Sequence, residues 1–161
     1  GIEGDSASCA ELYALLSSLA AVPLAQGIAV TGSLNANGDL LPVGGINEKI
    51  EGFFRSCERV GLDGTQGVLI PERNQRHLML DERVLEAVRQ GRFHVHAAST
   101  VAQGMTLLCG LPWGERGPAG YPAGSLLGRA QARLHRFRQA FDAAGAHHEQ
   151  AAHKRHHLHG H

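Results

Sequence analysis

Cysteine, aromatic residues and long apolar runs are all scarce in this chain of 161 residues. Its three cysteines, Cys9, Cys57 and Cys109, are far apart and outside any CxxC pair, which favours reduced, buried thiols over disulfides or a cysteine metal site. No apolar run reaches the roughly 18 residues that cross a membrane, and the chain opens without the basic segment of a signal peptide. We therefore expect a cytoplasmic protein without membrane contact.

Charge of one sign does not dominate the chain, whose formal net charge is zero. Residues 1–110 carry eight Lys/Arg and twelve Asp/Glu, a net charge of −4, whereas residues 111–161 carry seven and three, a net charge of +4. Eight of the eleven histidines also lie in the second part. Because no stripe of basic residues alternates with aromatic ones, nucleic-acid binding is not expected.

Apolar patterning predicts alternating helices and strands. Ser8 and Glu11 form a capping box, after which apolar residues follow at helical spacing until Pro23. The next segments are predicted as a strand over 27–34, a turn over 35–38, a returning strand over 40–43 and a helix that Asn47 can cap. Further on we predict a buried strand over 67–71, a helix over 81–90, a strand over 93–97 and a helix over 100–109. This alternation predicts an α/β or α+β fold with a layered sheet.

The composition changes after about residue 111. Residues 112–124 are rich in Pro and Gly and are predicted to be a linker, so residues 1–111 should hold the compact core. Residues 125–144 could form an Arg-rich helix, and 145–161 form a polar, His-rich end that we expect to be disordered. Imidazoles of this end could bind a metal, but no Cys or carboxylate cluster defines a structural site, so we predict none.

A serine near the start of the chain is placed as a nucleophile would be. Ser6 lies in Gly4-Asp5-Ser6-Ala7-Ser8, a turn of small residues before the first predicted helix. Unpaired N–H groups and the helix dipole at such a position can stabilise an oxyanion, although a serine there is more often a structural cap. A serine hydroxyl also needs a base to take its proton.

Lys49 is the candidate base, because it is the single lysine in residues 1–110. Lysine, unlike arginine, can lose its proton at accessible pH. A place in the first turn of the second predicted helix, with Ile46, Ile50 and Phe53 nearby, would favour the neutral amine through the helix dipole and desolvation. The alternative for any single lysine is a solvated surface residue.

Three ordered motifs resemble the proteolytic domain of Lon proteases. They are residues 3–12 with the run Gly-Asp-Ser-Ala-Ser, residues 27–33, and residues 42–54 with the run Pro-Val-Gly-Gly-Ile-Asn-Glu-Lys. The serine motif is similar to that of the bacterial Lon-like branch, and the spacing between Ser6 and Lys49 also matches the family. The resemblance continues through 66–71 and fades after about Leu111.

This resemblance implies a Ser–Lys dyad in which Ser6 attacks the peptide carbonyl and Lys49 transfers the proton. Thr31 stands where the family has a threonine that hydrogen-bonds the lysine. Gly44 and Gly45 would let the backbone turn ahead of the lysine helix. The implied fold is the layered, ribosomal protein S5 domain 2-like fold of the Lon proteolytic domain.

The residue before the nucleophile, Asp5, is a feature of the Lon-like branch. Its amide, or that of a neighbour, would join the amide of Ser6 in the oxyanion hole. We assign no catalytic role to the side chain of Asp5, and in the alternative interpretation it is simply a helix cap. None of the eleven histidines falls within the motifs, which argues against a His-based triad.

The family also implies an ATP-dependent endopeptidase that degrades unfolded or damaged proteins as a homohexamer with a fused AAA+ ATPase. The chain has no GxxxxGK[ST] phosphate loop, and the strands that precede the serine in a complete domain are missing. We therefore expect a part of a longer polypeptide, with ATP and Mg²⁺ bound in the motor domain and no cofactor here. The alternative is a non-catalytic assembly module of the same fold, against which Ser6, Thr31 and Lys49 together argue.

Overall fold

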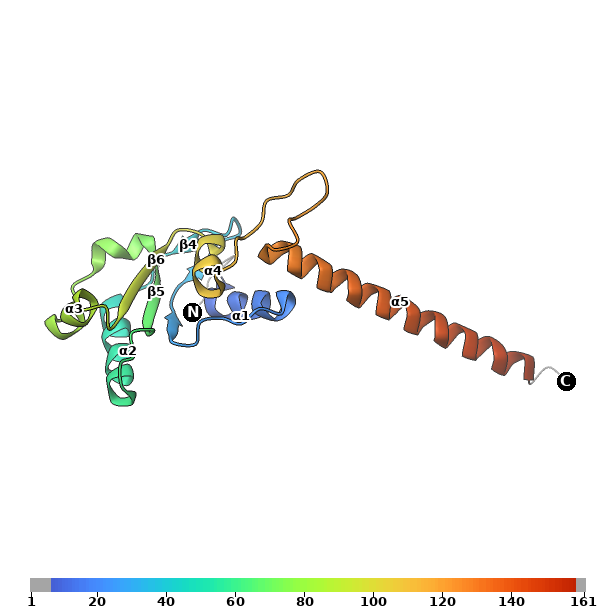
Figure 1. Cartoon of the computed structure of the whole chain (residues 1–161), viewed down its shortest axis with the longest axis horizontal. Coiled ribbons are helices and arrows are strands. Elements are labelled where there is room, and N and C mark those ends of the chain that lie inside the picture. The colour runs from blue at the N-terminus through green and yellow to red at the C-terminus, as the bar shows by residue number, and fades with distance from the viewer. Residues whose placement is uncertain (1–6, 159–161) are drawn as a thin grey trace.

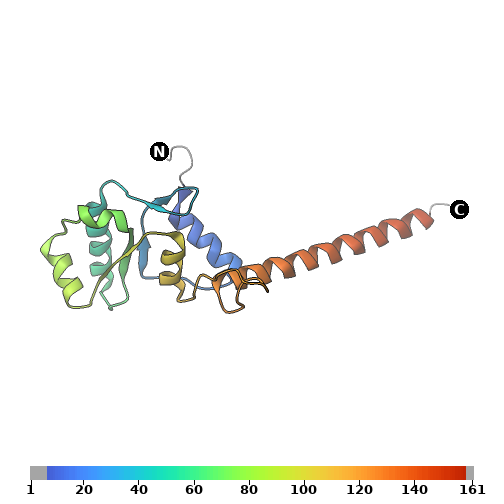
Figure 2. The same cartoon turned by 90° about the horizontal axis from the view of Figure 1, so that it is seen from above.

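A computed structural model describes residues 7–158, with the side chains of Ala7, His148 and residues 154–158 left out of the description. The chain forms a body of short strands and helices from which one long helix projects (Figures 1 and 2). Within residues 7–158, no helix is long and apolar enough to span a membrane.

Two small sheets organise the body. The first is parallel, in the order β2-β5-β6, and comprises β2 (Ile28–Val30), β5 (Gly67–Pro71) and β6 (His94–Ala98). Its register places Val68 between Ala29 and Val95. The second is antiparallel, in the order β1-β3-β4, and comprises β1 (Ala7–Ser8), β3 (Ser33–Leu34) and β4 (Leu40–Leu41).

Side chains of the central strand β5 alternate between two apolar cores. Leu69 packs with α1 and α4 on one face of the parallel sheet, whereas Val68 and Ile70 pack with α2 and α3 on the other. All five residues of β5 are buried, as predicted for a strand covered on both faces. Helices on both faces of a parallel sheet confirm the predicted α/β class.

The segment predicted as one strand over 27–34 is divided between the two sheets. Residues 28–30 pair with β5 and residues 33–34 with β1 and β4. Between them Gly32 has a φ of 111°, which favours glycine and turns the chain out of the first sheet. The predicted hairpin is confirmed, with Leu34 opposite Leu40 and the Asn35 Oδ1 accepting from the Asp39 N–H at 3.1 Å.

Helix ends follow local signals at three of the four helices of the body. Side-chain caps from Ser8, Asp81 and Thr100 precede α1 (Cys9–Ala20), α3 (Glu82–Arg89) and α4 (Val101–Cys109). The prediction that Asn47 caps α2 (Ile46–Val60) is wrong, because the helix begins after Gly45. Asn47 instead donates to the His77 carbonyl at 2.9 Å and accepts from the Met79 N–H at 2.7 Å.

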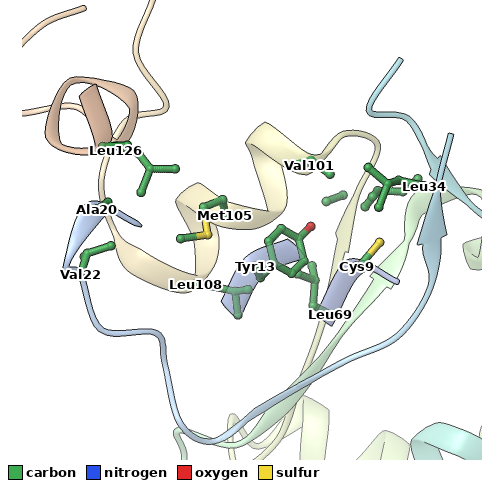
Figure 3. Packing of buried hydrophobic residues seen from close by; sticks show 13 residues of the cluster. Cys9, Tyr13, Ala20, Val22, Leu34, Leu69, Val101, Met105, Leu108 and Leu126 are labelled. Atoms are coloured by element: carbon green, nitrogen blue, oxygen red, sulfur yellow. The ribbon is translucent and has the colours of Figure 1, made fainter. Parts of the chain in front are cut away.

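Helices α1 and α4 approach closely at Tyr13 (Figure 3). The ring of Tyr13 occupies the space beside Gly104, where an added Cβ would overlap the tyrosine hydroxyl. Tyr13 is 1% exposed, and within the described residues its hydroxyl has no hydrogen-bond partner. Glycine at 104 thus lets the two helices pack around a buried aromatic ring.

The three cysteines are free thiols, and the predicted burial holds for two of them. Cys9 and Cys57 are buried and Cys109 is half-buried. Burial raises the pKa of Cys9 to about 11, which makes this thiol unreactive at neutral pH.

The long helix α5 (Leu126–Leu158) begins where a helix was predicted, but its first turn is packed on the body and its far end lies beyond the predicted end. Its start belongs to the packed core, because Leu126 is fully buried and Arg129 donates to the Ala21 carbonyl at 3.0 Å. Residues 112–124 hold no helix or strand, but they return to the body, and the Leu126 N–H donates to the Pro112 carbonyl at 2.8 Å.

The far end of α5 continues past 144, where a disordered tail was predicted. Nine of the fifteen residues of 144–158 are good helix formers, five are histidines of intermediate propensity, and Gly145 is the weakest position. Low apolar content predicts disorder in this segment, whereas its helix propensity favours the helix that is observed.

Candidate active site

The segment that would carry the nucleophile lies at the start of the described chain. Ser6 and Asp5 themselves lie outside the described residues. Directly after them, β1 pairs with β3, with Ala7 opposite Leu34 and Ser8 opposite Ser33, and the Cys9 N–H donates to the Gly32 carbonyl at 3.2 Å. The chain leaving position 6 therefore runs alongside residues 32–34.

Lys49 lies in the first turn of α2, as predicted, but its side chain is exposed. Its Nζ donates to the Gly44 carbonyl at 2.9 Å. The expected apolar surroundings are missing, because Ile46 and Ile50 turn into the core below the helix. Ile46 and Ile50 are buried, but they do not bury Lys49, which lies on the exposed side of the helix.

A glycine turn precedes Lys49. Gly45 has a φ of 68° and is the residue from which α2 begins, and its carbonyl accepts from the Lys49 N–H at 3.1 Å. Gly44 has an ordinary φ and contributes the carbonyl that holds the Lys49 ammonium. The tight turn expected here is present, and both glycine carbonyls contact the lysine.

Thr31 occupies the crossing between the two sheets. Its hydroxyl donates to the Leu69 carbonyl at 3.2 Å, and its N–H donates to the same oxygen at 3.0 Å. The bond expected between Thr31 and Lys49 is not formed, because the Thr31 proton goes to β5 and the Lys49 ammonium to Gly44. In the described part of the chain, Thr31 ties the crossing segment to the central strand.

Asn74 is a site residue that the sequence did not single out. It lies in the short 3₁₀ helix η1 (Glu72–His77), directly after β5, and is fully buried. Its Oδ1 accepts from the Val43 N–H at 2.9 Å, and its Nδ2 donates to the Val43 carbonyl at 2.9 Å. Because Val43 precedes the glycine turn, Asn74 fixes the backbone from which Lys49 is presented. The only sequence signal is a polar residue after a buried strand, which many loops share.

A cavity of about 300 Å³ lies beside the 3₁₀ helix and is lined by Asp39, Leu40, Glu72, Arg73 and Ser99. The Ser99 hydroxyl donates to the Glu72 carboxylate. Of the predicted site residues that the structure describes, namely Thr31, Gly44, Gly45 and Lys49, none lines this cavity. Within the described residues, no group of three or more His, Cys, Asp or Glu side chains could hold a metal ion.

Residues 2–109 match the family model of the Lon protease (S16) C-terminal proteolytic domain. The chain is 50% identical over 116 residues to a Lon protease homolog of Escherichia coli (strain K12), which covers 72% of this chain and 20% of that protein. It is 47% identical over 109 residues to a Lon protease homolog of Haemophilus influenzae, a match that covers 68% of this chain and 18% of that protein.

An archaeal Lon protease from Halobacterium salinarum is 40% identical over 89 residues, which are 55% of this chain and 12% of that protein. The chain thus spans a fifth or less of the length of these relatives. The matched region runs from before the serine motif to the end of α4 and includes the lysine turn. The chain therefore belongs to the family of Lon protease (S16) C-terminal proteolytic domains.

Proposed function

We propose that this domain is a serine-type endopeptidase in which Ser6 is the nucleophile and Lys49 the general base. The observation that carries the proposal is the placement of Lys49. It is the single lysine of residues 1–110 and follows a glycine turn whose Gly44 carbonyl accepts from its ammonium group. The buried Asn74 fixes Val43, the residue before that turn. Membership in the Lon proteolytic family supports the same assignment.

The chemistry follows from these two side chains. The neutral Lys49 amine takes the proton of the Ser6 hydroxyl as its oxygen attacks the peptide carbonyl. The amine then returns the proton to the leaving amino group, which leaves an acyl-enzyme that water hydrolyses in the reverse sequence. The Lys49 side chain is exposed in this chain, so bound substrate or further segments of the longer protein would have to cover it.

The dyad is tested by Ser6→Ala, Lys49→Ala and Lys49→Arg in the full-length protein, assayed with a fluorescently labelled unfolded protein. Each variant should lose peptide hydrolysis, and the double alanine variant should be no worse than either single one, because the two residues act as a unit. Lys49→Arg fails because a guanidinium does not act as a base. Arg55→Ala, an exposed cation on the same helix, is the matched control and should keep full activity. Substantial hydrolysis by Ser6→Ala would refute the assignment.

Thr31 is proposed to orient Lys49 once the site is covered by substrate. Thr31→Val keeps the shape and removes the hydroxyl. Loss of the orienting bond would cost about 1–3 kcal/mol of transition-state stabilisation, read as a fall in kcat with the same KM. An unchanged kcat would leave Thr31 with the role described above, that of tying the crossing segment to Leu69.

The activity of the longer protein is proposed to be ATP-dependent degradation of unfolded proteins in the cytoplasm, by a homohexamer with a fused AAA+ module. The chain contains no GxxxxGK[ST] phosphate loop, so ATP and Mg²⁺ are proposed to bind in the fused AAA+ module. The alternative, a non-catalytic assembly module, predicts that a fluorophosphonate probe fails to label the protein. Labelling that is lost in Ser6→Ala would favour the enzyme.

A further inference from the structure

The exposed part of α5 carries a line of large apolar side chains. Leu134 is 51% exposed, Phe137 72% and Phe141 71%. Together with residues before and after them they repeat at alternating steps of three and four, as Leu127, Ala130, Leu134, Phe137, Phe141 and Ala144. We name these six residues the α5 seam.

This alternation of three and four residues is typical of a helix that pairs with another helix. Apolar residues at alternating steps of three and four average 3.5 residues per repeat and form the narrow contact line of a coiled coil. The start of the seam is already used, because Ala130 is 7% exposed and packs in the core with Ala20 and Val22 of the α1 end. The rest leaves the body along the projecting helix (Figures 1 and 2).

Two arginines flank the uncovered part of the seam. Arg133 directly precedes Leu134 and Arg138 directly follows Phe137, which places them on opposite sides of the contact line. Within the described residues, neither arginine forms an ion pair. The single acid between residues 126 and 148, Asp142, lies away from the contact line.

This charge pattern selects among occupants. In two parallel copies of α5, Arg133 of one helix would face Arg138 of the other, and like charges at these positions oppose pairing. A partner helix with Glu or Asp beside its own apolar line would pair with both arginines. The exposed apolar surface is also small, about two Phe and one Leu side chain, which is below the roughly 800 Å² per partner of a standard stable interface.

We propose that the α5 seam docks an acidic amphipathic helix of a protein partner. The apolar line of the partner packs on Leu134, Phe137 and Phe141, and its flanking carboxylates pair with Arg133 and Arg138. The interaction is reversible and depends on salt, because the charges are exposed.

The test uses the full chain and a labelled synthetic peptide of about three heptads with Leu at the contact positions and Glu at the flanking positions. Its matched control has Lys at the flanking positions. Fluorescence anisotropy should show at least about tenfold tighter binding of the acidic peptide. Phe137→Ser with Phe141→Ser should weaken that binding at least about tenfold, and circular dichroism should show that the helix persists, since both rings are exposed.

Reversing the charge of the two arginines tests their role directly. Arg133→Glu with Arg138→Glu should reverse the preference toward the basic peptide, whereas Arg136→Glu, on the opposite side of the helix, should change affinity less than about twofold. Ser6→Ala should leave binding unchanged, so failure here is distinguishable from failure of the proposed peptidase.

Three outcomes would overturn the proposal. Equal binding of both peptides would remove the role of the arginines. Concentration-dependent self-association that Phe137→Ser abolishes would assign the seam to a second copy of this chain. Binding to phosphatidylcholine–phosphatidylserine vesicles, lost in Phe137→Ser and without any peptide preference, would assign it to an anionic membrane surface.

Discussion

Replacement of Asn74 by Ala would test whether the 3₁₀ helix holds the segment that presents Lys49. The change removes the acceptor for the Val43 N–H and the donor for the Val43 carbonyl, both at 2.9 Å. An unpaired buried polar group costs about 1–3 kcal/mol. Val43 is half-buried, so water can reach part of this backbone and the lower part of that range applies to each group. We expect a loss of about 2–3 kcal/mol in the free energy of unfolding.

A loss of that size is a large share of the about 5–15 kcal/mol that stabilises an ordinary domain. It is measured by urea unfolding followed by circular dichroism, with Gln75→Ala as the matched control. Gln75 follows Asn74 in the same 3₁₀ helix and is exposed, so its replacement should stay within about 0.5 kcal/mol of the wild type. If the peptidase assignment holds, Asn74→Ala should also lower hydrolysis under conditions where the protein remains folded. An unfolding free energy for Asn74→Ala equal to that of Gln75→Ala would refute the reasoning.

Two further predictions concern polar groups that the fold buries fully, at Tyr13, or partly, at His96. Tyr13→Phe should raise the free energy of unfolding by about 1 kcal/mol, because it removes a buried hydroxyl that has no partner within the described residues; a destabilised variant in urea unfolding would show that the hydroxyl is satisfied. Burial and the neighbouring His94 lower the pKa of His96 below its ordinary value of 6.5, so the unfolded chain binds a proton that the folded chain does not, and stability should fall as pH drops through about 6.5. His96→Gln should flatten that dependence in unfolding midpoints measured between about pH 7.5 and 5.5, and an unchanged slope would assign it to other groups.

Elements whose signals are local could be predicted from the sequence. The capping box at Ser8, the turn at Asn35–Gly38 and the unbroken apolar run of β5 each determine structure within a few residues. Features that depend on partners distant in sequence could not. Asn47 is a residue type that often caps helices, but it contacts His77 at the end of η1 and Met79 just after it.

The candidate site shows the same division. The position of Lys49 on a helix behind a glycine turn follows from its own neighbours, and so it was predictable. Its exposure was not, because Ile46 and Ile50 are close in sequence yet lie on the helix face that enters the core. Asn74 was missed because its importance arises from Val43, which reaches it only through the fold.

The contact between Tyr13 and Gly104 has a consequence for how this family can vary. Since an added Cβ at position 104 would overlap the tyrosine ring, Ala or any larger residue there is compatible only with a smaller side chain at position 13. Phe at 13 does not relieve the overlap, because the ring carbon Cζ is also within contact distance of that Cβ. Homologous chains should therefore exchange these two positions together, with a large residue at one accompanied by a small residue at the other. Such covariation would report the closeness of α1 and α4 from sequences alone.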